Sequence, residues 1–277
     1  MRLKNILVAI CLFLFFFYGF SFAQTKGEAE KFYKLGEEAY QERDYQEALH
    51  YFKKSLEISQ KIKFWGGIAA SLESIGVIYA RLGNYDKALR HLKEALDIKR
   101  KYNLPQESIA NTLASLGAIS RDFGHYDQSL KYYKELLEIC KELDIPESIA
   151  RCLHKIALVY EIMGNTKEAL KCYQEELEIK RKHNFFQKEI AKTLDNIGEM
   201  CNALSLYEDA LEYLQEALDI AKKFDLHDIA GKSLVHIGDA YQHLGPIGKD
   251  LECYEEALEI FKKLYSPLSL LIPFLLL

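Results

Sequence analysis

The residues best suited to chemistry in this chain are its eight histidines and six cysteines, and neither type forms a recognised motif. No two histidines stand in an H-E-x-x-H arrangement, and no cysteines form a C-x-x-C pair. The chain also lacks a phosphate-binding glycine loop, a dinucleotide fingerprint and a G-x-S-x-G elbow. We therefore expect a protein without catalytic residues, cofactor or metal, whose function depends on a binding surface.

The chain is built from a repeat of 40 or 41 residues, and this repeat determines where its polar residues lie. Set on a glycine near the middle of each copy, the six copies are centred on residues 36, 76, 117, 157, 198 and 238, with alanine replacing glycine at 157. Every copy has a leucine thirteen residues after this position and an isoleucine twenty-two residues after it. A fixed period of this length predicts a solenoid, in which each unit packs only on its neighbours.

Each copy has the pattern of two amphipathic helices joined by a tight turn. In the second copy, Ile68, Leu72, Ile75 and Tyr79 are spaced four, three and four residues apart, which places them on one face of a helix. Gly83 then suits a left-handed helix C-cap, and a second apolar helical pattern follows. The repeat therefore predicts an all-α fold with residues 24–263 as one array.

These columns resemble the tetratricopeptide repeat (TPR). Its Leu-Gly pair, the aromatic residue three positions later and its Ala-Leu pair match Ile75-Gly76, Tyr79 and Ala88-Leu89. The usual TPR period is about 34 residues, and the longer period here is similar to that of kinesin light chains and of bacterial TPR signalling proteins. The resemblance implies a right-handed α-solenoid of about six helix-turn-helix repeats, with a concave groove lined by the first helix of each repeat.

The groove residues follow from the helical period and from this resemblance. Positions six and three before the glycine, and one, four and five after it, fall opposite the buried face of each first helix. In this register the groove is apolar near Ala70, Val77 and Ala80 and polar further along. The polar candidates for partner binding are Asn111, Arg121, Arg151, His154, Lys192, Asp195, Glu199, Asn202, Lys232, Asp239 and Gln242.

Three of these candidates form a basic column with a spacing of one repeat. Arg151, Lys192 and Lys232 each stand six residues before the central position. We expect them to hold acidic groups or a carboxylate of an extended partner, while Asn111 and Asn202 bond its backbone. The alternative is that these residues are ordinary charges on a solvated helix face.

The N-terminal residues have the order of a secretory signal peptide. Arg2 and Lys4 precede an apolar run, and small residues at Ser21 and Ala23 suit cleavage after residue 23. The alternative is an uncleaved membrane anchor. We expect an exported protein, periplasmic or extracellular. Its five remaining cysteines are expected to be buried thiols, and no disulfide can be assigned from the sequence.

The C-terminal residues 264–277 are apolar but too few to span a bilayer as one helix. Pro267 and Pro273 also argue against one straight helix. Three interpretations remain open: a cap folded on the last repeat, partial insertion into a membrane, or the start of a transmembrane helix that continues beyond Leu277.

The charge balance limits the class of partner. Without residues 1–23 the chain has 34 basic and 41 acidic residues, a net charge of −7, which does not suit nucleic acid. Two basic clusters, residues 99–101 and 180–182, stand at predicted ends of second helices, where cations complement the helix dipole. The main hypothesis is a scaffold that binds a protein or peptide. The alternative is the extracytoplasmic sensing region of a membrane-bound signalling protein.

Overall fold

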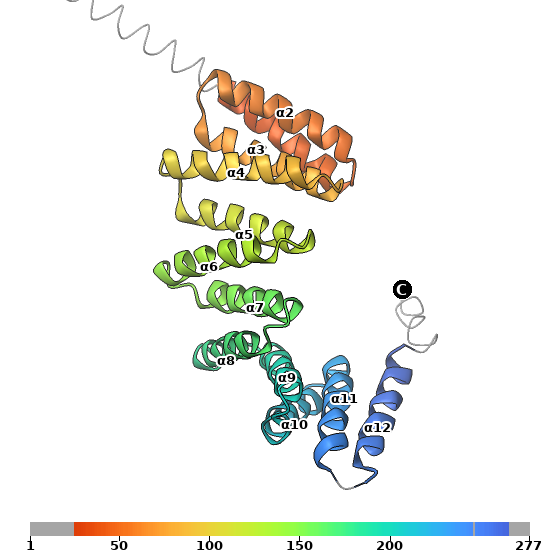
Figure 1. The fold of residues 1–277 in the computed structure, drawn as a ribbon. Coiled ribbons are helices and arrows are strands. Elements are labelled where there is room, and N and C mark those ends of the chain that lie inside the picture. Colours follow the sequence, from red (N-terminus) through yellow and green to blue (C-terminus); the bar gives the residue numbers. More distant parts are fainter. Residues whose placement is uncertain (1–24, 246, 266–277) are drawn as a thin grey trace, which may run out of the picture. The chain divides into compact units, whose positions relative to one another are not determined.

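The computed structural model describes residues 25–245 and 247–265 (Figure 1). Within these residues every regular element is an α-helix and no strand occurs, so the predicted all-α repeat fold is confirmed. No helix in the described part is long and apolar enough to cross a membrane. The expected signal peptide, residues 1–23, and residues 266–277 of the apolar tail lie outside the described residues.

The helices come in consecutive pairs, one pair for each sequence repeat. The first helices of the pairs are residues 25–41, α3 (Trp65–Arg81), α5 (Gln106–Asp122), α7 (Pro146–Ile162), α9 (Gln187–Ala203) and α11 (His227–Leu244). The second helices are α2 (Tyr45–Lys61), α4 (Tyr85–Lys101), α6 (Tyr126–Glu142), α8 (Thr166–Lys182), α10 (Tyr207–Lys223) and α12 (Lys249–Leu264).

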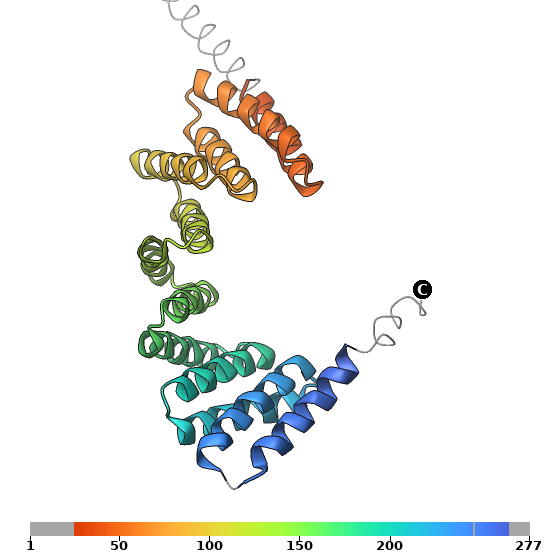
Figure 2. The same cartoon turned by 45° about the vertical axis from the view of Figure 1, so that its right-hand side comes forward.

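The chain forms two compact units, divided within α6 between Tyr132 and Tyr133. In the N-terminal unit, α3 contacts α2, α4 and α5. In the C-terminal unit, each helix from α7 to α12 contacts the next, and α9 also contacts α11 (Figure 2). Contact between successive first helices is what places their exposed faces side by side.

The glycine in the middle of a first helix allows the second helix of the same pair to approach closely. A Cβ atom at Gly76 would lie 2.8 Å from Leu92 Cγ and 3.1 Å from the carbonyl oxygen of Ala88. In the fourth pair the equivalent residues are Ala157 and Tyr173, both fully buried. The glycine column therefore allows close packing of the two helices of a pair.

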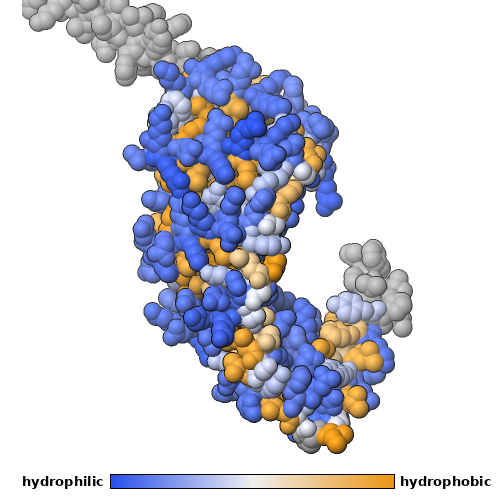
Figure 3. Space-filling model, in the orientation of Figure 1, coloured by the Kyte–Doolittle hydropathy of each residue, from blue (hydrophilic) through white to orange (hydrophobic). Residues whose placement is uncertain are grey.

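The leucines thirteen residues after the glycine are less buried than their regular spacing predicts. The column is buried in the first three pairs and half-buried in the next two, whereas Leu251 in the last pair is 61% exposed. No further pair follows α12 among the described residues to cover this side. Figure 3 shows apolar side chains at the surface where α12 lies.

The turns between helices use the left-handed backbone conformation at regular intervals. Gly83, Gly124 and Gly164 have φ values of 75°, 80° and 74°, as expected for a left-handed C-cap. The same positive φ occurs at seven residues with side chains, namely Arg43, Lys63, Asn103, Asp144, Asn184, Ser205 and Asp225. One turn geometry therefore recurs both within and between repeats, and it keeps the repeat length nearly constant.

Candidate partner-binding surface

In the N-terminal unit the exposed faces of the first helices form three adjoining hollows. A first hollow of about 260 Å³ lies between residues 25–41 and α3, and it shares Tyr33 and Glu37 with a second of about 380 Å³. The second shares Val77 with a third of about 380 Å³, which reaches α5. Ala70 and Ala80, which the sequence places in the apolar part of the groove, also line these hollows.

The second hollow combines aromatic walls with carboxylates. The Tyr33 hydroxyl lies 3.0 Å from Ser74 Oγ, and its ring packs edge-on against a buried Phe52. Burial raises the pKa of Tyr33, and the negative charges of Glu37 and Glu73 raise it further against the opposing effect of the Ser74 hydrogen bond. The predicted Asn111 lines the same hollow. This hollow therefore combines apolar surface with a negative potential.

In the C-terminal unit the predicted basic column is exposed on three first helices. Arg151 on α7, Lys192 on α9 and Lys232 on α11 all lie at the surface. Arg151 Nη2 donates to Ser148 Oγ at 3.1 Å, and Lys192 Nζ lies 3.7 Å from a Glu189 oxygen. Exposed contacts of this kind contribute at most about 1 kcal/mol, so a partner can replace them at little cost.

Four other predicted residues remain at least partly exposed, but two of them already have close partners. Glu199 and Gln242 are exposed. Arg121 Nη2 lies 2.7 Å from a carboxylate oxygen of its neighbour Asp122. Asp239 is half-buried and accepts a hydrogen bond from the Tyr254 hydroxyl at 2.8 Å.

Asp195 and Asn202 differ from the prediction, because α11 covers the side of α9 on which they lie. Asp195 is only 5% exposed; one of its oxygens accepts from Ser233 Oγ at 2.7 Å and lies 3.3 Å from His236 Nδ1. Asn202 Nδ2 donates to the backbone oxygen of His236 at 2.8 Å. The predicted bond from Asn202 to a partner backbone is therefore made within the chain. The helical period of one helix cannot show that the neighbouring helix covers this position.

Polar side chains are also buried between the second and third repeats. Lys99, which the sequence places at the end of a second helix, is 3% exposed. Its Nζ atom lies 2.6 Å from Glu73 Oε2, 2.8 Å from the Ser108 carbonyl oxygen and 2.7 Å from Thr112 Oγ1. The ammonium group is therefore enclosed by three oxygen partners, two of them on the next repeat.

The fourth and fifth repeats meet in a similar way. Lys180 Nζ lies 2.7 Å from Glu176 Oε1 and 3.0 Å from Thr193 Oγ1. The second oxygen of Glu176 lies 3.2 Å from Nδ1 of the predicted groove residue His154. Burial alone would raise the pKa of Glu176, but His154 and Lys180 together outweigh burial and lower it. His154 is thus partly used to support this buried group.

These contacts belong to two sequence columns, which we call the junction layer: the residue twenty-three after each central position and the residue five before the next one. The five pairs are Ser59 with Ser71, Lys99 with Thr112, Cys140 with Cys152, Lys180 with Thr193, and Ala221 with Ser233. The Cys140 and Cys152 sulfur atoms lie 3.8 Å apart. Lysine pairs with threonine twice and cysteine with cysteine once, and this pairing of the two columns is a signal that sequence reasoning missed.

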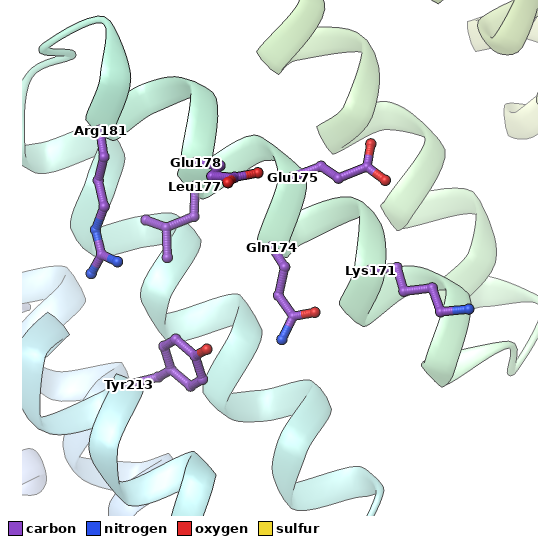
Figure 4. Close-up of a pocket in the computed structure, with 7 residues that line it drawn as sticks. All are labelled: Lys171, Gln174, Glu175, Leu177, Glu178, Arg181 and Tyr213. Carbon is purple, nitrogen blue, oxygen red and sulfur yellow. The ribbon is translucent and has the colours of Figure 1, made fainter.

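A further hollow, of about 420 Å³, lies on the second helices of the C-terminal unit between α8 and α10 (Figure 4). Its lining residues are Lys171, Gln174, Glu175, Leu177, Glu178, Arg181 and Tyr213. Arg181 Nη2 lies 2.6 Å from a Glu216 oxygen at its edge. Both positively and negatively charged side chains line this hollow. Elsewhere too, no group of three or more His, Cys, Asp or Glu residues in the described part of the chain is placed to hold a metal ion.

These features define a helical-repeat protein built from stacked helix pairs. The model of the tetratricopeptide repeat family matches residues 28–101, 108–182 and 189–263, and the chain belongs to this family. The family assignment made from the glycine, aromatic and alanine columns is confirmed.

Two curated relatives match parts of the chain. A clustered mitochondria protein homolog of Candida albicans is 34% identical over 80 residues, which are 28% of this chain and 6% of that protein. Tetratricopeptide repeat protein 29 of Macaca fascicularis is 29% identical over 102 residues, 37% of this chain and 21% of that protein. The match therefore spans at most about a fifth of the length of these relatives.

Three solved structures share the fold. BtubC (BKLC) from P. vanneervenii has a TM-score of 0.64 at 17% identity, over 80% of this chain and 92% of that one. TPR-like repeats of a Podosopora anserina kinesin light chain score 0.60 at 18% identity, over 71% and 96%. A signal transduction ATPase with numerous domains from Pyrococcus horikoshii, which has a tetratricopeptide repeat sensor, scores 0.70 at 19% identity, over 89% and 37%. The similarity to kinesin light chain repeats agrees with the long repeat period.

Proposed function

We propose that this chain is an interaction scaffold that binds a segment of another protein along the exposed faces of its first helices. The observation that carries this proposal is the basic column of the C-terminal unit, in which Arg151, Lys192 and Lys232 are exposed at equivalent positions of three successive repeats. Membership of the tetratricopeptide repeat family supports a role in protein binding.

The spacing of these cations favours an extended, acidic partner. Each cation belongs to a separate helix pair, so together they can contact carboxylates spread along a chain better than those of a compact ligand. Arg151 can bind a carboxylate with two parallel hydrogen bonds, whereas each lysine offers a single charged donor group. The exposed Glu199 lies two turns after Lys192 on the same face of α9 and can discriminate against a partner with misplaced acidic groups.

The test begins with a partner captured by the full chain and identified by mass spectrometry. Replacing Arg151, Lys192 and Lys232 together with Glu should weaken binding of that partner at least tenfold and leave the circular dichroism spectrum unchanged. The matched control replaces Lys131, Lys167 and Lys182, which are exposed on the second helices α6 and α8, with Glu. Equal weakening in both variants would show that only the net charge matters, and unchanged affinity in the first would remove the basic column from the binding site.

We further propose that the protein acts outside the cytoplasm, supported by the basic, apolar and small-residue order of residues 1–23. Protein recovered from an exporting host should begin at Gln24, as measured by intact mass. A chain that still begins at Met1 and stays in the membrane fraction would favour the anchor.

A second candidate function is the sensing region of a membrane-bound signalling protein. It is supported by the export-like N-terminus, by the apolar residues 264–277 and by the fold shared with a protein that has a tetratricopeptide repeat sensor. Determining the gene sequence beyond the codon for Leu277 tests this idea. A continuation into a transmembrane segment and an output domain would support it, and an immediate stop codon would contradict it.

A further inference from the structure

The first hollow of the N-terminal unit occupies the position that a lysine side chain fills elsewhere in the same molecule. Lys99 belongs to the junction layer and contacts residues of three columns: Glu73, three before the central position of its own repeat, and Ser108 and Thr112, nine and five before the next. Lys180 is bonded in the same way to the equivalent Thr193. Two of the five junctions therefore bury an ammonium group.

At the junction of the first two repeats the equivalent residue is Ser59, whose side chain is too short to reach across. The residues equivalent to Glu73 and Ser108 are Tyr33 and Gly67, and both line the 260 Å³ hollow together with Ser59. The hollow thus lies among the same columns that surround Lys99. Like Cys140 and Ala221 at the third and fifth junctions, Ser59 supplies no ammonium group, and at this junction a hollow lies beside it.

Polar atoms remain at the base of this hollow. Ser59 is fully buried, and its Oγ atom has no hydrogen-bond partner among the residues that the structure describes. The backbone of Gly67 lies directly against it, because a Cβ atom there would be 2.6 Å from Ser59 Oγ. Ser55, also in the lining, donates to the Ala29 carbonyl oxygen and accepts from Ser71. A buried hydroxyl without a partner costs about 1–3 kcal/mol, so a ligand that bonds Ser59 would remove this cost.

The walls and the entrance of the hollow suit a positively charged group on an alkyl stem. Ala29, Phe64 and Ala70 provide apolar wall surface. Glu30 and Glu37 stand at the exposed edge with Lys34. Lys26 also lies there, 3.7 Å from a Glu30 oxygen and 4.8 Å from the centre of the Phe64 ring. An ammonium group is therefore already accepted at this edge through exposed contacts, and an incoming one can replace it and pair with the same carboxylates, which partly offsets its loss of hydration.

We propose that this hollow receives the side chain of a lysine from the protein segment bound to the first-helix faces, with its ammonium group donating to Ser59 and its neighbours. This inference rests on the proposed scaffold function and names one feature of the partner. The entrance residues Glu30 and Ala70 occupy the column of Arg151, so the hollow opens on the face assigned to the partner. An ammonium group has three donors and no acceptor, which suits a site that presents oxygens.

The chemistry can be tested on the full chain without knowing the partner. The probes are Nα-acetyl-lysine amide and Nα-acetyl-norleucine amide, whose stem has a similar length but no charge. In a titration followed by two-dimensional NMR, the lysine probe should shift the backbone signals of Ser59, Gly66 and Gly67. We expect its affinity to be at least fivefold higher than that of the norleucine probe.

Two variants at the same position connect the signal to the hollow. Ser59→Lys supplies the ammonium from within, as Lys99 does, and should weaken binding of the lysine probe more than tenfold. Ser59→Ala keeps the hollow and removes one oxygen, so it should weaken binding at least threefold even if the lysine variant folds poorly. The matched control, Gln174→Lys, adds the same charge on the exposed surface of α8 and should leave the affinity unchanged.

Three results would overturn the inference: no shifts at tens of millimolar probe, equal binding of the norleucine probe, or full binding to both Ser59 variants. These results would leave the scaffold proposal standing, because they do not involve the basic column. The opposite outcome is also distinguishable. If the probe binds the hollow but charge reversal at Arg151, Lys192 and Lys232 has no effect on the partner, only the proposed role of the basic column is contradicted.

Discussion

Two lysines of residues 25–265 are buried, although lysine is rarely found inside proteins without a charged partner. Lys99 and Lys180 each have a carboxylate within 2.7 Å and a threonine hydroxyl on the next repeat. The loss of hydration of such a pair is costly, so the pair adds little net stability but makes removal of one partner severe. These residues make each repeat dependent on its neighbour.

Replacing Lys180 with Met should therefore strongly destabilise the protein. Glu176, 2% exposed, would lose its nearest cation and retain only His154. We expect a loss of about 3–5 kcal/mol in the free energy of unfolding, measured by urea denaturation. The double variant Lys180→Met, Glu176→Leu removes both charges and should recover most of this loss. A double variant as unstable as the single one would contradict the assignment of the cost to an unpaired carboxylate.

The ion pair of Asp195 and His236 should make stability depend on pH. Burial alone would lower the pKa of His236, but the hydrogen bond and charge of Asp195, with the charges of Glu199 and Asp239, raise it above the ordinary value of 6.5. Because the folded pKa is the higher one, the stabilisation is complete below about pH 6.5 and is lost as the pH rises through the folded pKa. Urea unfolding between pH 5.5 and 9 measures this dependence.

The variant His236→Asn serves as the reference, because the fifth repeat has Asn196 at the equivalent position. We expect wild type to exceed this variant by about 1.5–3 kcal/mol at low pH, as for a hydrogen bond to a charged group. The difference should shrink as the pH rises. A difference in unfolding free energy that grows with pH would contradict the predicted direction of the pH dependence.

Cys152 should resist thiol reagents in the folded protein. It is 4% exposed, and burial together with the neighbouring Cys140 raises the pKa of its thiol to about 12, so the thiolate is scarce at neutral pH. Modification by iodoacetamide, followed by peptide mass spectrometry, should be at least tenfold slower at Cys152 than at the more accessible Cys253. Equal rates in the folded state, with both sites fast in urea, would show that this junction is open.

At the scale of the helix, the central glycine is needed where the facing side chain is rigidly held. A Cβ atom at Gly198 would collide with the buried Leu214, so Gly198→Ala should cost about 1–3 kcal/mol in unfolding free energy. Gly27 provides the matched control: it lies in helical residues 25–41 with no atom within 4 Å of an added Cβ. Gly27→Ala should be neutral or stabilising by up to about 1 kcal/mol. Similar effects of both substitutions would show that contact with Leu214 does not cause the loss of stability.

The helices themselves could be predicted from the sequence, because apolar spacing and glycine turns are repeated six times. The left-handed turns at Lys63 and Arg43 could not, since a long side chain has no preference for positive φ. The burial of the leucine column was also overestimated, because its regular spacing does not distinguish a half-buried Leu170 from a buried Leu49. Periodicity gives the face of a helix and leaves open how closely the next helix covers it.

At the scale of the whole molecule, contacts are local, and the effect of a core substitution should be local too. Leu92 in the N-terminal unit and Leu214 in the C-terminal unit are both fully buried beneath a glycine. Leu92→Ala should cost about 2–5 kcal/mol and speed hydrogen exchange mainly in α2 to α5. Exchange in α9 to α12 should stay slow, and Leu214→Ala should show the reverse pattern. Uniform acceleration across the chain would indicate one cooperative unit.

The exposure of a candidate residue could be predicted only where it depends on one helix alone. Arg151, Lys192 and Lys232 are exposed, as the period of their own helices predicts. Asp195 was misplaced because its exposure depends on α11. The hollow beside Ser59 could not be foreseen either; it lies beside a small residue where the second and fourth repeats have lysine.

Polar contacts between repeats also restrict the order of the array. In these contacts one repeat carries one partner and its successor carries the other: Asp195 needs the histidine of the sixth repeat, and a second copy of the fifth would offer Asn196 instead. Identical helix pairs could be shuffled, duplicated or deleted freely. Here a rearrangement that separates Asp195 from His236, or a buried lysine from the threonine of the next repeat, leaves a buried charge without one of its partners. The buried polar groups thus select which repeats can pack on one another. A recombined version of this protein would have to keep the two residues of each such contact together.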